Sequence, residues 1–189
     1  MKLMLLISLL LIDICTGYAM AEPKNGFGLN IGATSNIMNS TFTVASGTNT
    51  VGSTSSYNSS GASLGMDYQM VFPNNLTLNP FLMVSNESTN LTTQSDTVME
   101  HNILGLQGRS WKGDLFVGVH GAIYTESTTT SSGTTTTSET GTGEGIVVGW
   151  EPSNGNWSIM LQGDSAKIKY ANQDVNWTGA RLSIGYRWK

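Results

Sequence analysis

The chain has 189 residues, which is enough for one domain. Its 9 Lys and Arg residues against 13 Asp and Glu residues give a net charge of −4, a balance that argues against a nucleic-acid partner. Only 12% of the residues are charged and 39% are hydrophobic, because Ser, Thr, Asn and Gly make up much of the rest. This composition favours β-structure with long polar connections.

The first 21 residues have the pattern of a secretory signal peptide. Lys2 precedes an apolar run, Leu3–Ile12, and Ala19-Met20-Ala21 supplies the small residues of a cleavage site. The run is shorter than the roughly 20 residues that a membrane-spanning helix needs. We therefore expect cleavage after Ala21, which leaves residues 22–189 as a single exported domain.

The only cysteine, Cys15, lies inside this predicted leader. Ile14 before it is not small, so the segment does not fit a lipoprotein signal. The exported domain would then contain no disulfide, although small secreted domains often rely on them. A closed barrel would supply the missing stabilisation.

Apolar and polar residues alternate with a period of two along the rest of the chain, and no stretch keeps a helical period over three turns. This pattern predicts eight strands. Their ranges are 27–37, 61–71, 76–85, 101–110, 115–124, 145–151, 157–170 and 177–189. Pro80 should cause a bulge or a local break in the third strand, because it lacks a backbone donor.

The connections between these strands alternate in length. Long tracts of Ser, Thr, Asn and Gly occupy residues 39–60, 86–97 and 125–142, and a shorter polar link occupies 171–176. Tight turns fall at 72–75, 111–114 and 152–156. A transmembrane β-barrel has short periplasmic turns and long external loops, so the tracts are interpreted as external loops.

The two faces of each strand differ in the way that such a barrel requires. One face is apolar and would contact lipid, while the other is rich in Gly, Ser, Asn and Thr and carries the few charges. Aromatic residues at strand ends are interpreted as interfacial girdles. They are Phe27, Trp150, Trp157, Trp177, Tyr186 and Trp188. The predicted fold is all-β, an eight-stranded antiparallel transmembrane up-and-down β-barrel whose narrow interior is filled by side chains.

The C-terminal sequence "ARLSIGYRW" resembles the assembly signal of bacterial outer-membrane β-barrels, with alternating apolar and aromatic residues before a terminal aromatic. The matching residues are Ala180, Leu182, Ile184, Tyr186 and Trp188, while Lys189 departs from the pattern. The whole exported domain is similar in plan to small eight-stranded barrels, such as the outer membrane protein X/Ail/Lom group and the transmembrane domain of outer membrane protein A. This resemblance implies a bacterial outer-membrane location and the β-barrel assembly machinery, outer-membrane lipid and lipopolysaccharide as partners.

Seven ionisable residues fall on the predicted lumen face and form the candidate site, a lumen charge network. They are Asp67, Arg109, His120, Glu151, Asp164, Arg181 and Arg187. Because an unpaired buried charge is costly, the opposite charges should pair, with Asp164 and Glu151 as the carboxylates opposite Arg181 and Arg187. The network could be a plug of ion pairs, or a gate whose partners exchange to open a narrow pore.

These observations predict a structural or surface-interaction protein of the outer membrane, with or without a narrow pore. The Ser- and Thr-rich tracts would be available to a surface ligand or a phage, and no catalytic, metal or cofactor site is assigned. One alternative is a soluble periplasmic calycin-like barrel with its apolar face around a hydrophobic ligand. Another is an outer-membrane lipid-modifying enzyme, for which His101 beside Glu100 at the outer rim and nearby loop serines are the only candidates.

Overall fold

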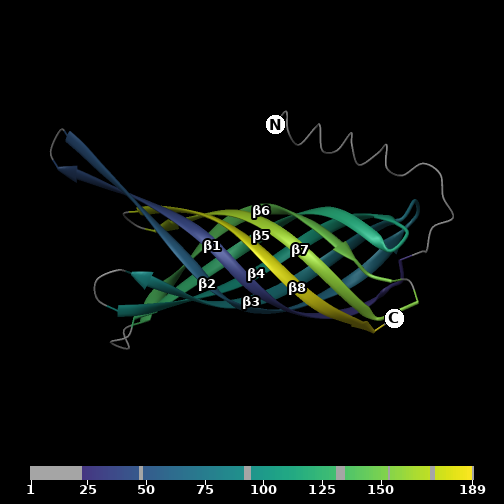
Figure 1. Cartoon of the computed structure of the whole chain (residues 1–189). Coiled ribbons are helices and arrows are strands. Elements are labelled where there is room, and N and C mark those ends of the chain that lie inside the picture. The colour runs from purple at the N-terminus through teal and green to yellow at the C-terminus, as the bar shows by residue number, and fades with distance from the viewer. Residues whose placement is uncertain are drawn as a thin grey trace.

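The computed structural model describes residues 23–46, 49–91, 95–130, 135–152, 154–170 and 173–188, so the predicted signal peptide lies outside the described residues. Eight strands follow one another along the chain (Figure 1). They are β1 (Gly26–Ser46), β2 (Asn49–Phe72), β3 (Leu76–Leu91), β4 (Ser95–Lys112), β5 (Leu115–Thr130), β6 (Thr135–Trp150), β7 (Trp157–Tyr170) and β8 (Gln173–Trp188). No helix in the described ranges is long and apolar enough to span a membrane.

Each strand pairs antiparallel with its neighbours in sequence, and β1 also pairs with β8, which closes the sheet into a barrel. Following the paired residues once around the barrel from Trp150 leads back to the same strand at Thr140, ten residues away. An offset of this size in an eight-stranded barrel corresponds to a strand tilt of roughly 40°.

Three short connections lie together at one end of the barrel, which we call the tight-turn end (Figure 1). Asn74 and Asn75 have φ values of 65° and 56° in the first turn, and Gly113 has a φ of 61° in the second. Asn and Gly tolerate this left-handed conformation, which lets two antiparallel strands join through so few residues. The opposite end, where the strands continue past the barrel, is the hairpin end.

The polar tracts that we interpreted as loops are mostly strand. β1 and β2 stay paired out to Ser46 and Asn49, and β3 and β4 stay paired out to Leu91 and Ser95. Seven of the eight strands therefore exceed the predicted lengths, and β7 spans the predicted range 157–170. Thr and Ser tolerate extended backbone, so the hydrogen-bond ladder continues after the apolar pattern has ended.

Pro80 interrupts the β2–β3 ladder as expected. The pairing passes from Asp67–Phe81 to Met70–Leu78 with no pairs between them, while on its other side Pro80 remains opposite Leu106 of β4. The register is unchanged across the gap, so the proline causes a local break and no bulge.

The barrel is apolar outside and polar inside. Large hydrophobic side chains such as Ile31, Leu64, Leu104 and Leu182 are exposed on the outer wall, whereas buried side chains include many polar and charged ones. This distribution excludes the soluble calycin-like alternative, whose apolar face would point inward. The chain folds as a transmembrane β-barrel.

One aromatic residue was placed on the wrong side of the wall. Trp177 was interpreted as part of the outer girdle, but it is 1% exposed and points into the lumen. Its position in the strand has the same parity as Arg181, so the alternation itself assigns it to the interior. Tyr186, Trp188 and Phe27 do form an outward aromatic group at the tight-turn end, with ring centroids 4.9 Å apart for Tyr186–Trp188 and 5.8 Å for Phe27–Trp188.

The lipid-facing belt can be tested with a charge. We expect Leu182→Arg to reduce the free energy of unfolding in phospholipid vesicles by about 2–4 kcal/mol, because Leu182 lies in the middle of the exposed apolar face of β8. Asn86→Arg, on the exposed face of β3 beyond its last apolar residue, serves as the control and should change it by less than about 1 kcal/mol. Denaturant titration followed by Trp fluorescence measures the free energy of unfolding of both variants. Equal losses in Leu182→Arg and Asn86→Arg would contradict the assigned belt.

Candidate functional site in the barrel lumen

The polar side chains of the lumen form three successive layers, and buried apolar side chains such as Ile103, Val147 and Ile168 fill the space between them. The base layer, at the tight-turn end, contains Asp67, Arg109, Glu151 and Arg187, which come from β2, from β4, from just after β6 and from β8. All four are at most 4% exposed. The layer contains two positive and two negative side chains, so its charges balance.

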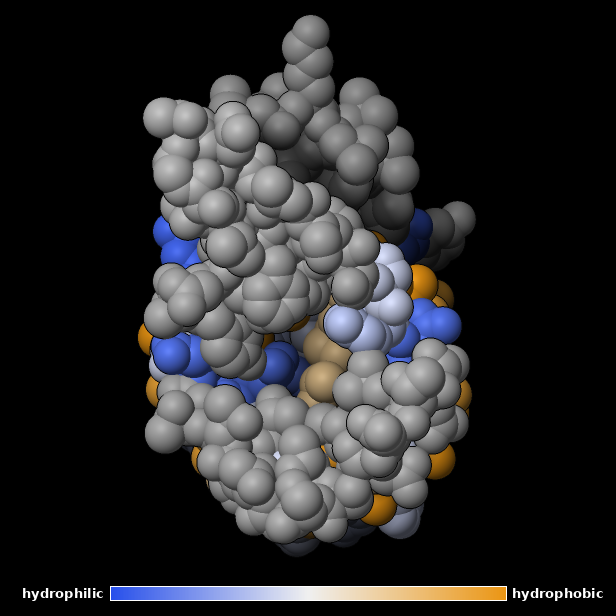
Figure 2. All heavy atoms as spheres, turned by 90° about the vertical axis from the view of Figure 1, so that its left-hand side faces the viewer, coloured by the Kyte–Doolittle hydropathy of each residue, from blue (hydrophilic) through white to orange (hydrophobic). Residues whose placement is uncertain are grey.

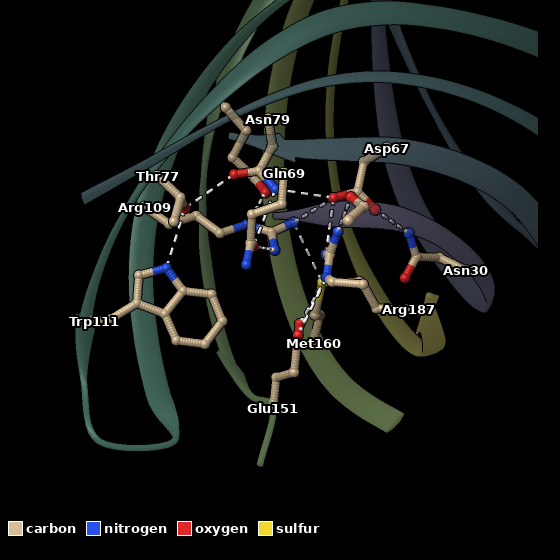
Figure 3. A network of polar contacts seen from close by, with 12 residues as sticks. Asn30, Asp67, Gln69, Thr77, Asn79, Arg109, Trp111, Glu151, Met160 and Arg187 are labelled. Atoms are coloured by element: carbon tan, nitrogen blue, oxygen red, sulfur yellow. Dashed lines mark hydrogen bonds and ion pairs between the residues drawn. The ribbon is translucent and has the colours of Figure 1, made fainter. Parts of the chain in front are cut away.

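Arg187 joins the two carboxylates of the base layer (Figure 3). Its Nη2 donates to Asp67 Oδ2 at 2.9 Å, and its Nε donates to Glu151 Oε1 and Oε2 at 3.1 and 3.2 Å. Its Nη1 donates to the carbonyl oxygen of Gly26 at 3.1 Å. One guanidinium thus ties three segments of the wall together, and charge-assisted hydrogen bonds of this kind are among the stronger ones in proteins.

Asp67 is the acceptor at the centre of the same layer. Asn79 Nδ2 donates to its Oδ2 at 2.9 Å, and Asn30 Nδ2 donates to its Oδ1 at 3.2 Å. Arg109 Nη2 lies 3.7 Å from Oδ2, and the Arg109 guanidinium also stacks 4.6 Å from the centre of the Phe116 ring. Two neutral amide donors and a second cation therefore surround the Asp67 carboxylate. They replace the hydrogen bonds that water would otherwise provide to it.

Two buried aromatic side chains, Trp111 and Phe116, lie at one side of the base layer. Trp111, which we placed in a turn, ends β4 as an inward residue at 3% exposure, with its ring centroid 4.7 Å from that of Phe116. Its indole N–H donates to Thr77 Oγ1 at 3.0 Å (Figure 3). The turn it was assigned to consists of Gly113 and Asp114 alone.

The middle layer surrounds Asp164 of β7. His120 Nε2 lies 2.7 Å from Asp164 Oδ1, and Arg181 Nη1 lies 3.5 Å from Oδ2. Gln162 Nε2 donates to Oδ1 at 2.9 Å. Gly145 makes room for the imidazole, because a Cβ at this position would overlap the His120 ring. The structure thus brings Arg181 to Asp164 and Arg187 to Glu151, and it adds Asp67 as a second partner of Arg187.

Between these two layers the lumen holds a cavity of about 20 Å³, lined in part by Arg109, Gln107, Gln162 and Arg181. That volume accommodates about one water molecule. The Nε and Nη1 atoms of Arg181 are buried there and make no protein hydrogen bond.

A third, outer layer was not identified from the sequence. His101 points inward, not toward the rim, and its Nε2 lies 3.0 Å from Glu126 Oε2 while its Nδ1 lies 3.6 Å from Glu87 Oε1. Trp177 Nε1 lies 3.2 Å from the same His101 Nε2. Glu100, which we paired with His101, is exposed on the outer wall. His101 begins the predicted strand 101–110 and shares the parity of Arg109, which already assigns it to the lumen, and extending the parity into the polar tracts would have added Glu87 and Glu126.

The outer layer resembles a serine–histidine–carboxylate array without its geometry. Ser85 Oγ is 3.5 Å from His101 Nδ1 but donates to Glu87 Oε1 at 3.2 Å. The hydroxyl proton is therefore directed at the carboxylate. A nucleophilic serine would instead direct it at the imidazole. Ser85 and His101 are both fully buried, so the array fills the barrel. Within the described residues, no group of three or more His, Cys, Asp and Glu side chains has a geometry that could hold a metal ion.

Comparisons with known proteins place the fold among outer-membrane barrels. No family model matches the chain, and no curated protein matches it. Neisserial surface protein A has a similar structure, with a TM-score of 0.60 at 8% identity over 85% of this chain and 97% of that one. The outer membrane protein AlkL, solved in lipid bilayers, gives a TM-score of 0.51 at 12% identity over 92% and 95% of the two chains. At these identities the likeness shows a shared fold alone.

The number of partners that each arginine has predicts how much it stabilises the barrel. Arg187→Gln should reduce the free energy of unfolding by about 3–5 kcal/mol, because it leaves two buried carboxylates without their shared cation. Arg181→Ser should cost less, since Arg181 reaches only Asp164, at 3.5 Å, and has free donors.

Lys112→Gln, at an exposed lysine outside the lumen, is the control and should be neutral within about 0.5 kcal/mol. Denaturant titration in detergent micelles or vesicles measures all three variants. A loss from Arg181→Ser that matches or exceeds the loss from Arg187→Gln would contradict the layered arrangement.

Proposed function

We propose that the protein is a closed β-barrel of the bacterial outer membrane that anchors extended hairpins at the cell surface for interaction with a ligand. The observation that supports this proposal most directly is the combination of a filled lumen with strands that continue beyond the apolar belt. A conducting barrel needs an open interior, and this one holds three layers of paired side chains with about 20 Å³ between two of them.

The outer-membrane location is supported by the fold and by the distribution of aromatic side chains. The tight turns lie at the aromatic end and the long hairpins at the other, which corresponds to the periplasmic and external sides of an outer-membrane barrel. Figure 2 shows the barrel from the hairpin end, where both hydrophilic and weakly hydrophobic residues are visible in a central hollow. The leader predicted at residues 1–21 would deliver the chain for export.

The outward face of β8 supports recognition by the β-barrel assembly machinery. Ala180, Leu182, Ile184 and Trp188 are exposed on one face, and Tyr186 lies between them half-buried. A receptor that reads alternate residues of a strand would find all five on the same side. Arg181 and Arg187 on the other face are engaged in the lumen and would be unavailable to it.

The hairpins support a role in surface contact. No charged residue occurs between Lys24 and Asp67, so the β1–β2 hairpin is neutral and hydroxyl-rich from Gly26 to Met66. Such a surface can bind through hydrogen bonds and van der Waals contact, without the salt dependence of a charged interface. A neutral surface ligand or a phage would be partners of this type.

Fractionation and electrophoretic mobility test the location. A membrane barrel should remain folded in cold detergent and shift its gel mobility on boiling, and protease added to intact cells should cut within the hairpins and not within the tight turns. Recovery of the protein in the soluble periplasmic fraction would refute the proposal.

Conductance tests the closed lumen separately. In a planar bilayer the protein should give no current steps, because the base layer blocks the lumen at the tight-turn end. A porin reconstituted in the same bilayer is the control and should conduct. Reproducible steps from the purified protein would favour the gate interpretation over the plug.

A further inference from the structure

The apolar belt on the outer wall differs in height around the barrel. On β2, six successive outward positions are apolar or aromatic, from Phe72 to Ala62. On β6 there are only three, Ile146, Val148 and Trp150, before the exposed Glu144. On β7 there are also three, and small or polar outward residues follow them.

The numbers of apolar outward positions correspond to different heights of apolar wall along the membrane normal. Six alternate positions of a tilted strand cover roughly 24 Å along the membrane normal, close to the ~25 Å band typical of such barrels. Three alternate positions cover only about 10 Å. The wall formed by β6 and β7 is therefore too short to match the hydrocarbon layer that fits β2.

The short part of the belt ends in a continuous polar row. Glu144 stands directly opposite Gly121 of β5 and Ser165 of β7, and Ser165 stands opposite Thr178 of β8. All four residues are exposed. A Cβ at Gly121 would meet no atom within 4 Å, so nothing covers the backbone at that position. We call these four residues together with Lys167 the polar notch.

Charges of both signs lie at the notch. Following the paired rows to β2 places Trp150 about 7 Å above Phe72, Glu144 about 3 Å below Ala62, and Ile146, the last apolar residue of β6, about 8 Å below Ala62. Lys167 and Lys169 follow Ser165 on the outward face of β7, and both are exposed. In the described ranges the other exposed cations, Lys24 and Lys112, lie at the tight-turn end.

We propose that the polar notch is a contact site for the headgroups of membrane lipids on the hairpin side, which descend along β6 and β7 to the level of Glu144. A carboxylate facing acyl chains is unfavourable, but one that accepts hydrogen bonds from hydroxyl or ammonium groups of a lipid is not. Lys167 and Lys169 lie above it, where they can meet lipid phosphate. This inference rests on the membrane location proposed above.

Single cysteines can measure the depth of the membrane boundary, because Cys15 is the only natural cysteine. In a Cys15→Ser background, Ser165→Cys reports the notch and Ala62→Cys reports the tall side of the belt. The two positions lie at similar heights along the barrel axis. The paired row from Ser165 crosses β8 and β1 and reaches Asn58 of β2 in three steps, which rise about 10 Å toward the hairpin end because the strands are tilted. The four residues from Asn58 to Ala62 along β2 then descend by about the same distance.

In vesicles of phosphatidylethanolamine and phosphatidylglycerol, a water-soluble maleimide should label Ser165→Cys at least tenfold faster than Ala62→Cys. Equal, slow labelling would overturn the notch, and so would a disulfide between two Ser165→Cys chains, which would show that a second copy covers it. Fast labelling of both positions, or loss of the heat-dependent mobility shift, would instead refute the membrane location.

Glu144→Leu tests whether the Glu144 carboxylate is what brings the polar boundary of the membrane to the notch. It lengthens the apolar face of β6, so the Ser165→Cys labelling rate should fall to within about threefold of the rate at Ala62→Cys. Phospholipid that stays bound after detergent exchange, counted by native mass spectrometry, should also decrease. Glu100→Leu, on the outward face of β4, is the matched control and should change neither readout. Unchanged labelling in Glu144→Leu would overturn the role of the carboxylate.

Discussion

A sheet in contact with lipid cannot leave backbone N–H and C=O groups unpaired, since no water is present to bind them. The pairing of β1 with β8 satisfies this constraint, because it removes both edges of the sheet. It also determines the interior. Eight strands enclose a space only as wide as the side chains that fill it, so every inward residue must fit its neighbours. The layers of the lumen follow from that closure.

Inside so narrow a space a charge is tolerated only with a partner. Asp67 has two guanidiniums and two amide donors, and Arg187 has two carboxylates and a carbonyl. Replacing either side chain would leave the remaining ones buried without compensation, which is why such networks rigidify a barrel as well as fill it. The closed interior directs attention to the outer wall and the hairpins as the surfaces where partners can bind.

The alternation of apolar and polar residues was enough to predict the strand number, the antiparallel order and the orientation of the wall. It also assigned residues such as Asp67 and Arg109 to the lumen side, where the structure places them. The pairing partners followed from it only in part, because Glu151 was expected beside Arg187 but Asp67 was not. Whether Arg187 meets Glu151, Asp67 or both depends on the ten-residue offset of the closed register, and this offset is a property of the whole barrel.

The errors share a cause, which is that the strands were taken to stop where the apolar pattern stops. Outside the membrane the outward face becomes polar too, so the contrast between faces disappears while the backbone ladder continues. Glu87 and Glu126 lie in that region, so the partners of His101 were missed for this reason. Trp177 was misassigned because its residue type was weighed above its parity.

The two ways in which the outward pattern ends are informative about the membrane. On β1 and β2 the apolar residues give way to neutral Ser, Thr and Asn, whereas on β6 they give way to a carboxylate that lies about 8 Å closer to the tight-turn end than Ser60 of β2. A bilayer can follow such an uneven belt by thinning locally or by letting the barrel tilt. Thinning brings headgroups to Glu144, while tilting would raise the β6 side and leave part of the β2 face in water. The closed, paired interior makes the barrel stiff, so its wall cannot bend to fit the bilayer and only thinning or rigid tilting remains. The exposed carboxylate of Glu144 favours thinning, because thinning supplies it with polar headgroups while the β2 face stays covered by lipid.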